Sequence, residues 1–135
     1  TSDGDLLVYG GIGVSGSVNA SSVGIADLTT IFSSYLVTSS TTSNQVLHSF
    51  DSNVYRTAKY VIQIGSGVQV HALEILLIHD GTDVYMTEYA QVLGSTNIAL
   101  STFDAQVNMS GMVELLVTPT YASTVYTCSC TAMRV

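Results

Sequence analysis

Seven short segments between residues 46 and 135 are rich in β-branched and aromatic side chains, and turn-forming residues separate them. These segments are residues 46–50, 55–64, 68–79, 83–93, 98–107, 112–118 and 123–135. Asp80 with Gly81, and Ser110 with Gly111, mark two of the turns, and the only proline, Pro119, stands where a strand should stop. Strands that recur every 10 to 12 residues or so are typical of an antiparallel sandwich or jelly roll.

Composition agrees with one folded domain. The chain has 135 residues, of which 47% are hydrophobic and 10% charged, and this balance excludes the disordered class. A chain of this length has room for one core. We therefore predict an all-β fold, namely an antiparallel, jelly-roll-like β-sandwich over residues 45–135, preceded by a glycine-punctuated N-terminal β arm.

The arm repeats a six-residue pattern, V-x-G-x-[IV]-x. Its members are Val8, Gly10, Ile12, Val14, Gly16 and Val18. Two repeats are too few to bury a core by themselves, so the arm either pairs as a strand with its own domain or winds with arms of other chains. We predict the second role, with Val8, Ile12, Val14 and Val18 as the assembly interface.

Residues 20–44 leave two structures open. Apolar side chains such as Leu28, Ile31 and Tyr35 are spaced three or four apart, which favours a short helix with Asp27 near its start. The intervening serines and threonines suit a strand equally well. Residues 39–44 are all polar and predict a loop, so we divide the chain into an arm and connector, residues 1–44, and a sandwich domain, residues 45–135.

The segment 68–79 is apolar on both of the faces that a strand would present. One face carries His71, Leu73, Ile75 and Leu77, and the other carries Val70, Ala72, Leu76 and Ile78. Such a strand is expected to be covered on both sides. We expect the second face to meet another subunit or to lie beneath the arm.

Charge excludes two classes of partner. Three Lys and Arg against ten Asp and Glu give a formal net charge of -7, so the chain cannot neutralise phosphates and is a poor match for nucleic acid or an anionic membrane. No apolar run approaches the ~18 residues of a membrane-spanning helix. The sequence begins at Thr1 without a leader segment, so we expect a processed product or a piece of a longer chain.

A catalytic or metal site would have to come from acidic and histidine residues in two neighbouring segments. These are His71, Glu74, His79, Asp80, Asp83 and Glu88. His71 and His79 lie eight residues apart, about 26 Å along a strand, which is too far to bind one metal ion. Asp80 is expected to bond backbone amides in its turn. Nucleophile and phosphate-binding motifs are missing, so we predict no enzyme, no cofactor and no metal.

Cys128 and Cys130 would point to the same face of a strand. Their Cα atoms would lie about 6.6 Å apart with parallel side chains, a poor geometry for a disulfide. We predict two free thiols that act as small buried apolar residues.

Three phrases resemble a domain of virion structural proteins from tailed phages, especially T4-like phages of marine cyanobacteria. They are Y-R-T-A-K-Y at residues 55–60, E-I-L-L-I-H-D-G-T at 74–82, and Y-M-T-E-Y at 85–89. A T-F-D segment at 102–104 and L-L-V-T-P at 115–119 extend the resemblance over roughly residues 45–135. Cys128 and Cys130 depart from it.

The resemblance implies a non-enzymatic virion structural protein, a fibre or capsid-decoration type of subunit that assembles through β-sheet surfaces. Its partners would be copies of itself, as a trimer or larger homo-oligomer, and other virion proteins, in a virion or other extracellular assembly. Two alternatives stay open: a fibre-tip domain that binds a host surface receptor, and a filament subunit that donates a strand to its neighbour.

Overall fold

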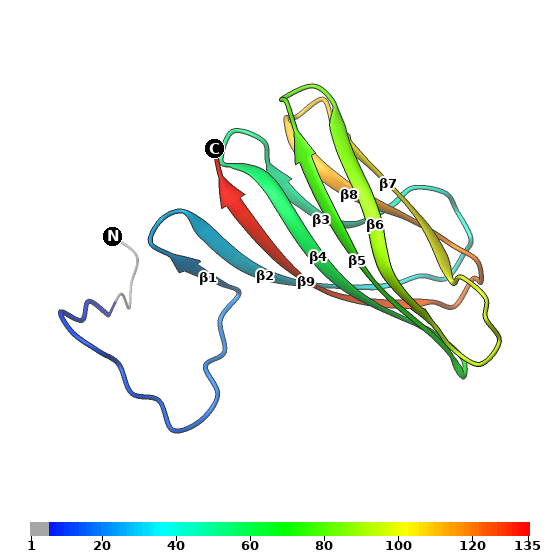
Figure 1. Ribbon diagram of the computed structural model, residues 1–135, viewed down its shortest axis with the longest axis horizontal. Coiled ribbons are helices and arrows are strands. Elements are labelled where there is room, and N and C mark those ends of the chain that lie inside the picture. Colours follow the sequence, from blue (N-terminus) through cyan, green and yellow to red (C-terminus); the bar gives the residue numbers. More distant parts are fainter. Residues whose placement is uncertain (1–5) are drawn as a thin grey trace.

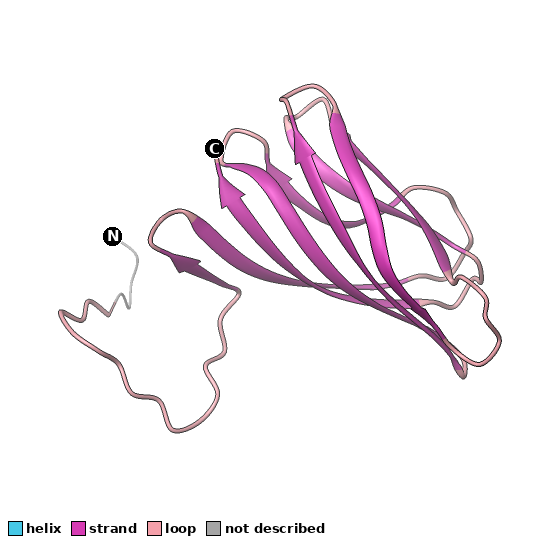
Figure 2. Cartoon of the chain, viewed as in Figure 1, coloured by secondary structure: helices cyan, strands magenta, loops and turns pink. Residues whose placement is uncertain are grey.

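Nine antiparallel strands build the described part of the molecule (Figure 1). A computed structural model describes residues 6–135, and this part of the chain contains strands and loops but no helix (Figure 2). The strands are β1 (Ser22–Ile25), β2 (Thr29–Val37), β3 (Gln45–Asp51), β4 (Tyr55–Ser66), β5 (Gln69–His79), β6 (Val84–Leu93), β7 (Ser101–Val107), β8 (Met112–Pro119) and β9 (Val125–Arg134). The expected all-β class is confirmed.

The strands divide unequally between two sheets. The large sheet has six strands in the order β1-β2-β9-β4-β5-β6, and the small sheet has three in the order β3-β8-β7. The last strand, β9, lies between β2 and β4 and pairs with both over nearly its whole length. This insertion joins the two halves of the large sheet, and the antiparallel sandwich expected from the sequence is confirmed.

The core lies between the inner faces of the two sheets. Alternation in β4 turns Tyr60, Ile62 and Ile64 inward, where each is fully buried. Ile75 and Leu77 on β5 do the same, and β8 supplies the opposing layer. The apolar residues that the small sheet adds to this core are Leu47, Phe50, Val113, Leu115 and Val117. One contiguous cluster therefore holds both sheets together.

Glycines occur where the turns need a left-handed backbone. Gly67, between β4 and β5, has φ of 59°, and Gly81, between β5 and β6, has φ of 104°. Gly111, between β7 and β8, has φ of 78°. The seven strands expected over residues 46–135 are all present as β3 to β9, with ends shifted by a few residues.

Residues 20–44 contain two strands, so the strand alternative holds and the helix is wrong. Ala26 and Asp27 occupy the turn between β1 and β2 with φ of 52° and 53°. The helix-like spacing arises because Ile31 and Tyr35 face outward while Phe32 and Leu36 face the core. Pairing with β9 along all nine residues of β2 decides the structure. The large sheet thus begins at residue 22, and the chain crosses from β2 to β3 of the small sheet through the loop of residues 38–44. The division of the chain at residues 44 and 45 stays a prediction.

The arm, residues 6–21, contains no strand in the single chain, and all its side chains are exposed. Ile12 is 65% exposed and Val18 is 69% exposed. Residues 1–5 of the expected arm lie outside the described residues. The predicted association of Val8, Ile12, Val14 and Val18 stays a prediction.

Candidate functional site

The outward side of the large sheet carries the largest set of exposed apolar side chains in the described chain outside the arm. We call this side the outer face. Its large apolar members are Val23, Ile25, Ile31, Tyr35, Val37, Val61, Val70, Leu76, Ile78, Tyr85, Val92, Val125 and Met133. They come from all six strands, so the apolar surface is a property of the whole sheet.

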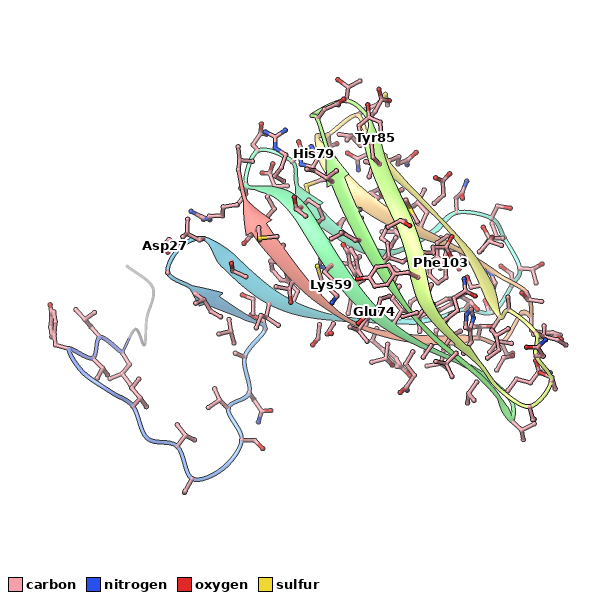
Figure 3. All side chains as sticks on the ribbon, viewed as in Figure 1. Asp27, Lys59, Glu74, His79, Tyr85 and Phe103 are labelled. Carbon is pink, nitrogen blue, oxygen red and sulfur yellow. The ribbon has the colours of Figure 1, made fainter. Side chains whose placement is uncertain are left out.

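The strands leave one ion pair on this face. Lys59 Nζ on β4 lies 3.7 Å from Glu74 Oε1 on β5, and both side chains are labelled in Figure 3. Because this pair joins one positive and one negative group, it leaves the middle of the outer face without net charge.

The outward side of the small sheet is different. Val46, which is 42% exposed, is the one exposed large apolar side chain among the strand residues of this sheet. Asp104 is exposed on β7, on the far side of Leu116 from Val46, and Gln106 Nε2 donates a hydrogen bond of 3.1 Å to Glu114 Oε1. This side is therefore typical of a sheet that faces water.

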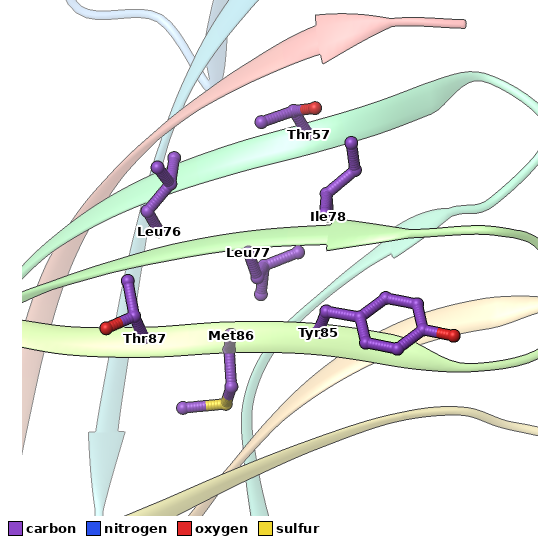
Figure 4. A pocket seen from close by; sticks show the side chains of 7 residues that line it. All are labelled: Thr57, Leu76, Leu77, Ile78, Tyr85, Met86 and Thr87. Carbon is purple, nitrogen blue, oxygen red and sulfur yellow. The ribbon is translucent and has the colours of Figure 1, made fainter.

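A shallow hollow of about 350 Å³ lies on the outer face between β4, β5 and β6 (Figure 4). Leu76, Ile78 and Tyr85 give it apolar walls, and Thr57 and Thr87 add hydroxyl groups. The Tyr85 hydroxyl donates to Asp80 Oδ2 at 3.0 Å instead of pointing a free group into the hollow. A hollow with so few converging polar groups suits an apolar side chain from a partner better than a reacting substrate.

Strand β2 is only partly paired on its side away from β9. β1 pairs with Thr29–Phe32 of β2, whereas residues 33–37 of β2 pair with β9 alone. The other side of residues 33–37 is thus an open edge at which an added strand could pair.

The histidine and acidic residues from which a catalytic or metal site would have to come are spread along β5, β6 and the turn between them. His71 and His79 lie at opposite ends of β5, and both are 2% exposed on its inner side. In the part of the chain that the structure describes, no three His, Cys, Asp or Glu side chains are grouped to hold a metal ion. The same described residues contain no helix long and apolar enough to cross a membrane.

His79 and Asp80 hold the β5–β6 turn together. Gly81 N–H donates to His79 Nδ1 at 3.0 Å, and His79 Nε2 lies 2.6 Å from the Tyr55 carbonyl oxygen. Asp80 Oδ1 accepts the N–H groups of Thr82 and Asp83, and these bonds hold the pKa of Asp80 below its usual value. The expected bonding of Asp80 to backbone amides is confirmed.

Cys128 and Cys130 are both free and buried on the inner side of β9. Burial raises the pKa of Cys128 to about 11 and that of Cys130 to about 12, so neither thiol ionises readily. The prediction of two unbonded apolar cysteines is confirmed.

Two histidines make folding sensitive to mild acid. Burial lowers the pKa of His48, whose Nδ1 lies 2.9 Å from the Tyr60 hydroxyl, and that of His71, whose Nδ1 accepts the Leu100 N–H at 3.3 Å. The unfolded chain therefore binds more protons than the folded chain once the pH falls below about 6.5.

We expect the free energy of unfolding to be highest above pH 6.5 and to fall as the pH drops toward the lowered pKa values. The slope is at most about 1.4 kcal/mol per pH unit for each histidine. Urea melts at pH 7.5 and pH 5.5 measure it. A double variant, His48→Gln with His71→Gln, should show a smaller difference between the two pH values, and an equal difference would contradict the assignment.

The sequence identified part of this surface. It identified Val70, Leu76 and Ile78 as a second apolar face, and the structure places them on the outer face. It missed Ile31 and Tyr35, because the fold of residues 20–44 was open, and it missed Val61 and Tyr85, whose place on this face depends on the pairing of β4, β5 and β6. The alternation of Ile31, Ser33, Tyr35 and Val37 was the signal available.

The fold is one that a phage tailspike contains. The tailspike protein of Acinetobacter phage vB_ApiP_P1 superposes on 97% of this chain with a TM-score of 0.51 and 12% sequence identity. The chain spans 26% of that tailspike, so the likeness concerns the fold of one part. No family model matches the sequence, and no curated protein matches it.

Proposed function

We propose that this chain is a non-enzymatic structural domain of a phage tail, of fibre or spike type. The observation that carries the proposal is the fold likeness to a phage tailspike over 97% of the chain. The sequence resemblance at residues 55–60, 74–82 and 85–89 to virion proteins of T4-like cyanophages supports the same class. Fold likeness and sequence phrases are separate kinds of observation, and they agree.

The chemistry of the described residues supports a structural role. His79 and Asp80 are engaged in the β5–β6 turn, and the thiols of Cys128 and Cys130 are buried with raised pKa values. The hollow on the outer face has apolar walls. These groups serve packing and turn formation, and the exposed apolar side chains of the outer face are suited to assembly.

In this proposal the chain works as a homo-oligomer, a trimer or larger, joined to other virion proteins. Val8, Ile12, Val14 and Val18 of the arm form a seam with the arms of other copies. All four are at least 40% exposed in the single chain, so burial against other copies would remove that apolar surface from water. The virion or a similar extracellular assembly is its location.

A second candidate function is a self-assembling filament subunit. The open edge at residues 33–37 of β2 favours it, because the extended arm of a neighbour could add a strand there. Both candidates use the arm, and they differ in the particle that contains the chain.

Immunogold electron microscopy tests the proposed function. Antibodies raised against the purified chain are applied to purified particles of the phage that encodes it. We expect gold on the tail or its fibres. Gold confined to the capsid would show a decoration protein, gold on free filaments would show the second candidate, and unlabelled particles would contradict a virion role.

A further inference from the structure

The two outward sides of this sandwich differ in how many apolar side chains they expose. A domain with water on both sides does not need this difference. Val46 is the one exposed large apolar side chain among the strand residues of the small sheet, whereas the outer face of the large sheet exposes apolar side chains on all six strands. We infer that the outer face is a docking site for a second copy of this chain. The inference deepens the proposed function and rests on it, because it names the surface through which the domains themselves meet.

Charge favours a second copy as the occupant. The chain carries a formal net charge of -7, so two copies repel each other unless they meet where charge is absent or balanced. On the outer face Lys59 and Glu74 neutralise each other at 3.7 Å. Asp104 and Glu114 lie on the small sheet, away from this face, and Asp80 lies at its edge, in the β5–β6 turn, where it accepts a hydrogen bond from the Tyr85 hydroxyl. A strongly basic partner would find its complement at those acids instead.

The size of the face matches what a stable contact requires. Six strands spaced about 4.8 Å apart give a width of about 24 Å, and ten residues at about 3.3 Å each give a length of about 33 Å. The product is roughly 800 Å², which is the area that each partner contributes to a standard protein interface.

The hollow and the arm lie in suitable places for this contact. Leu76, Ile78 and Tyr85 around the hollow can receive an apolar side chain of the facing sheet. At the other end of the face, Val23 and Ile25 on β1 directly follow the arm in sequence. Copies joined through their arms would therefore hold their outer faces near one another.

Val61 is the most informative position for a test. It lies on β4 near the middle of the sheet, opposite Ser129 on β9 and Glu74 on β5, and it is 48% exposed. Val61→Lys places an ammonium group in the contact, and the cost of taking this charge out of water opposes docking. Val68 is a matched control, because it is 97% exposed in the β4–β5 turn, away from the face.

The experiment is sedimentation equilibrium of the full chain, of Val61→Lys and of Val68→Lys, with thermal melting of each. We expect Val61→Lys to weaken association by about tenfold or more and Val68→Lys to leave it unchanged. Ile78→Lys, at a second position that is 47% exposed, should behave like Val61→Lys and covers the case in which Val61→Lys fails to fold.

Three results would overturn the docking site. The first is that both face variants associate as strongly as the parent chain. The second is that the parent chain stays monomeric. The third is that the face variants melt at a lower temperature but associate as before, which would mean that the chain's own arm covers the face. Gold on the phage tail together with unaffected face variants would remove the docking site and leave the proposed function standing. Unlabelled particles would remove the proposed function itself.

Discussion

Deletion of residues 1–20 is expected to weaken self-association by about tenfold or more while leaving the melting temperature within a few degrees of the parent. The arm residues described by the structure pair with no strand of their own domain, so the sandwich does not depend on them. Val8, Ile12, Val14 and Val18 each contribute about 1.5 to 3 kcal/mol when fully buried, and a tenfold change in association needs only about 1.4 kcal/mol. Sedimentation velocity and thermal melting measure the two effects.

A matched variant separates length from side chains. Replacing Val8, Ile12, Val14 and Val18 together by serine keeps the arm and removes its apolar groups, and it should match the deletion. An unchanged oligomer with a lowered melting temperature in both variants would refute the assembly role. It would show instead that the arm pairs with its own domain.

Ile62→Ala is expected to lower the free energy of unfolding by about 2 to 5 kcal/mol, a large part of the 5 to 15 kcal/mol typical of a domain. Ile62 is fully buried on β4, between Leu73 on β5 and Cys128 on β9, and the lost methyl groups leave a cavity in the core. Val68→Ala in the exposed turn is the control and should change the free energy by no more than about 0.5 kcal/mol. Urea unfolding of both variants gives the comparison.

This pair of variants tests the orientation of the large sheet. A shift of one residue in β4 would move Ile62 to the outer face and Val61 into the core. A cost for Ile62→Ala as small as that of the control would therefore contradict the assignment of inner and outer faces.

The strands could be predicted from the sequence because their signals are local. Alternation at Tyr60, Ile62 and Ile64 marks an inward face, and Gly67, Gly81 and Gly111 stand where the backbone turns with positive φ. Each of these signals needs only neighbours in the chain. All seven strands beyond residue 45 were found in this way.

The arrangement of the strands could not be predicted, because it depends on distant partners. Residues 29–37 fit a helix or a strand when taken alone, and β9, almost a hundred residues later, holds them as a strand. Pairing of β9 with β4 on its other side likewise leaves no local trace. The continuation of the sheet into the expected connector follows from these two pairings.

The candidate surface was only partly visible for the same reason. Leu76 and Ile78 could be assigned to a second apolar face because both faces of one strand are apolar. Ile31 and Val61 join them only when β2, β9 and β4 are placed side by side. A surface made by six strands can be recognised only in the folded structure, whereas the arm pattern from Val8 to Val18 can be recognised in the sequence.

The central claim is that this domain is built to meet copies of itself. Electron microscopy of the assembled particle, at a resolution that separates strands, tests this claim most directly. The account predicts that the arms of neighbouring copies run together and that Val61 and Ile78 on the large sheets face another copy. Arms folded back on their own domains, with the large sheets turned toward water, would contradict it.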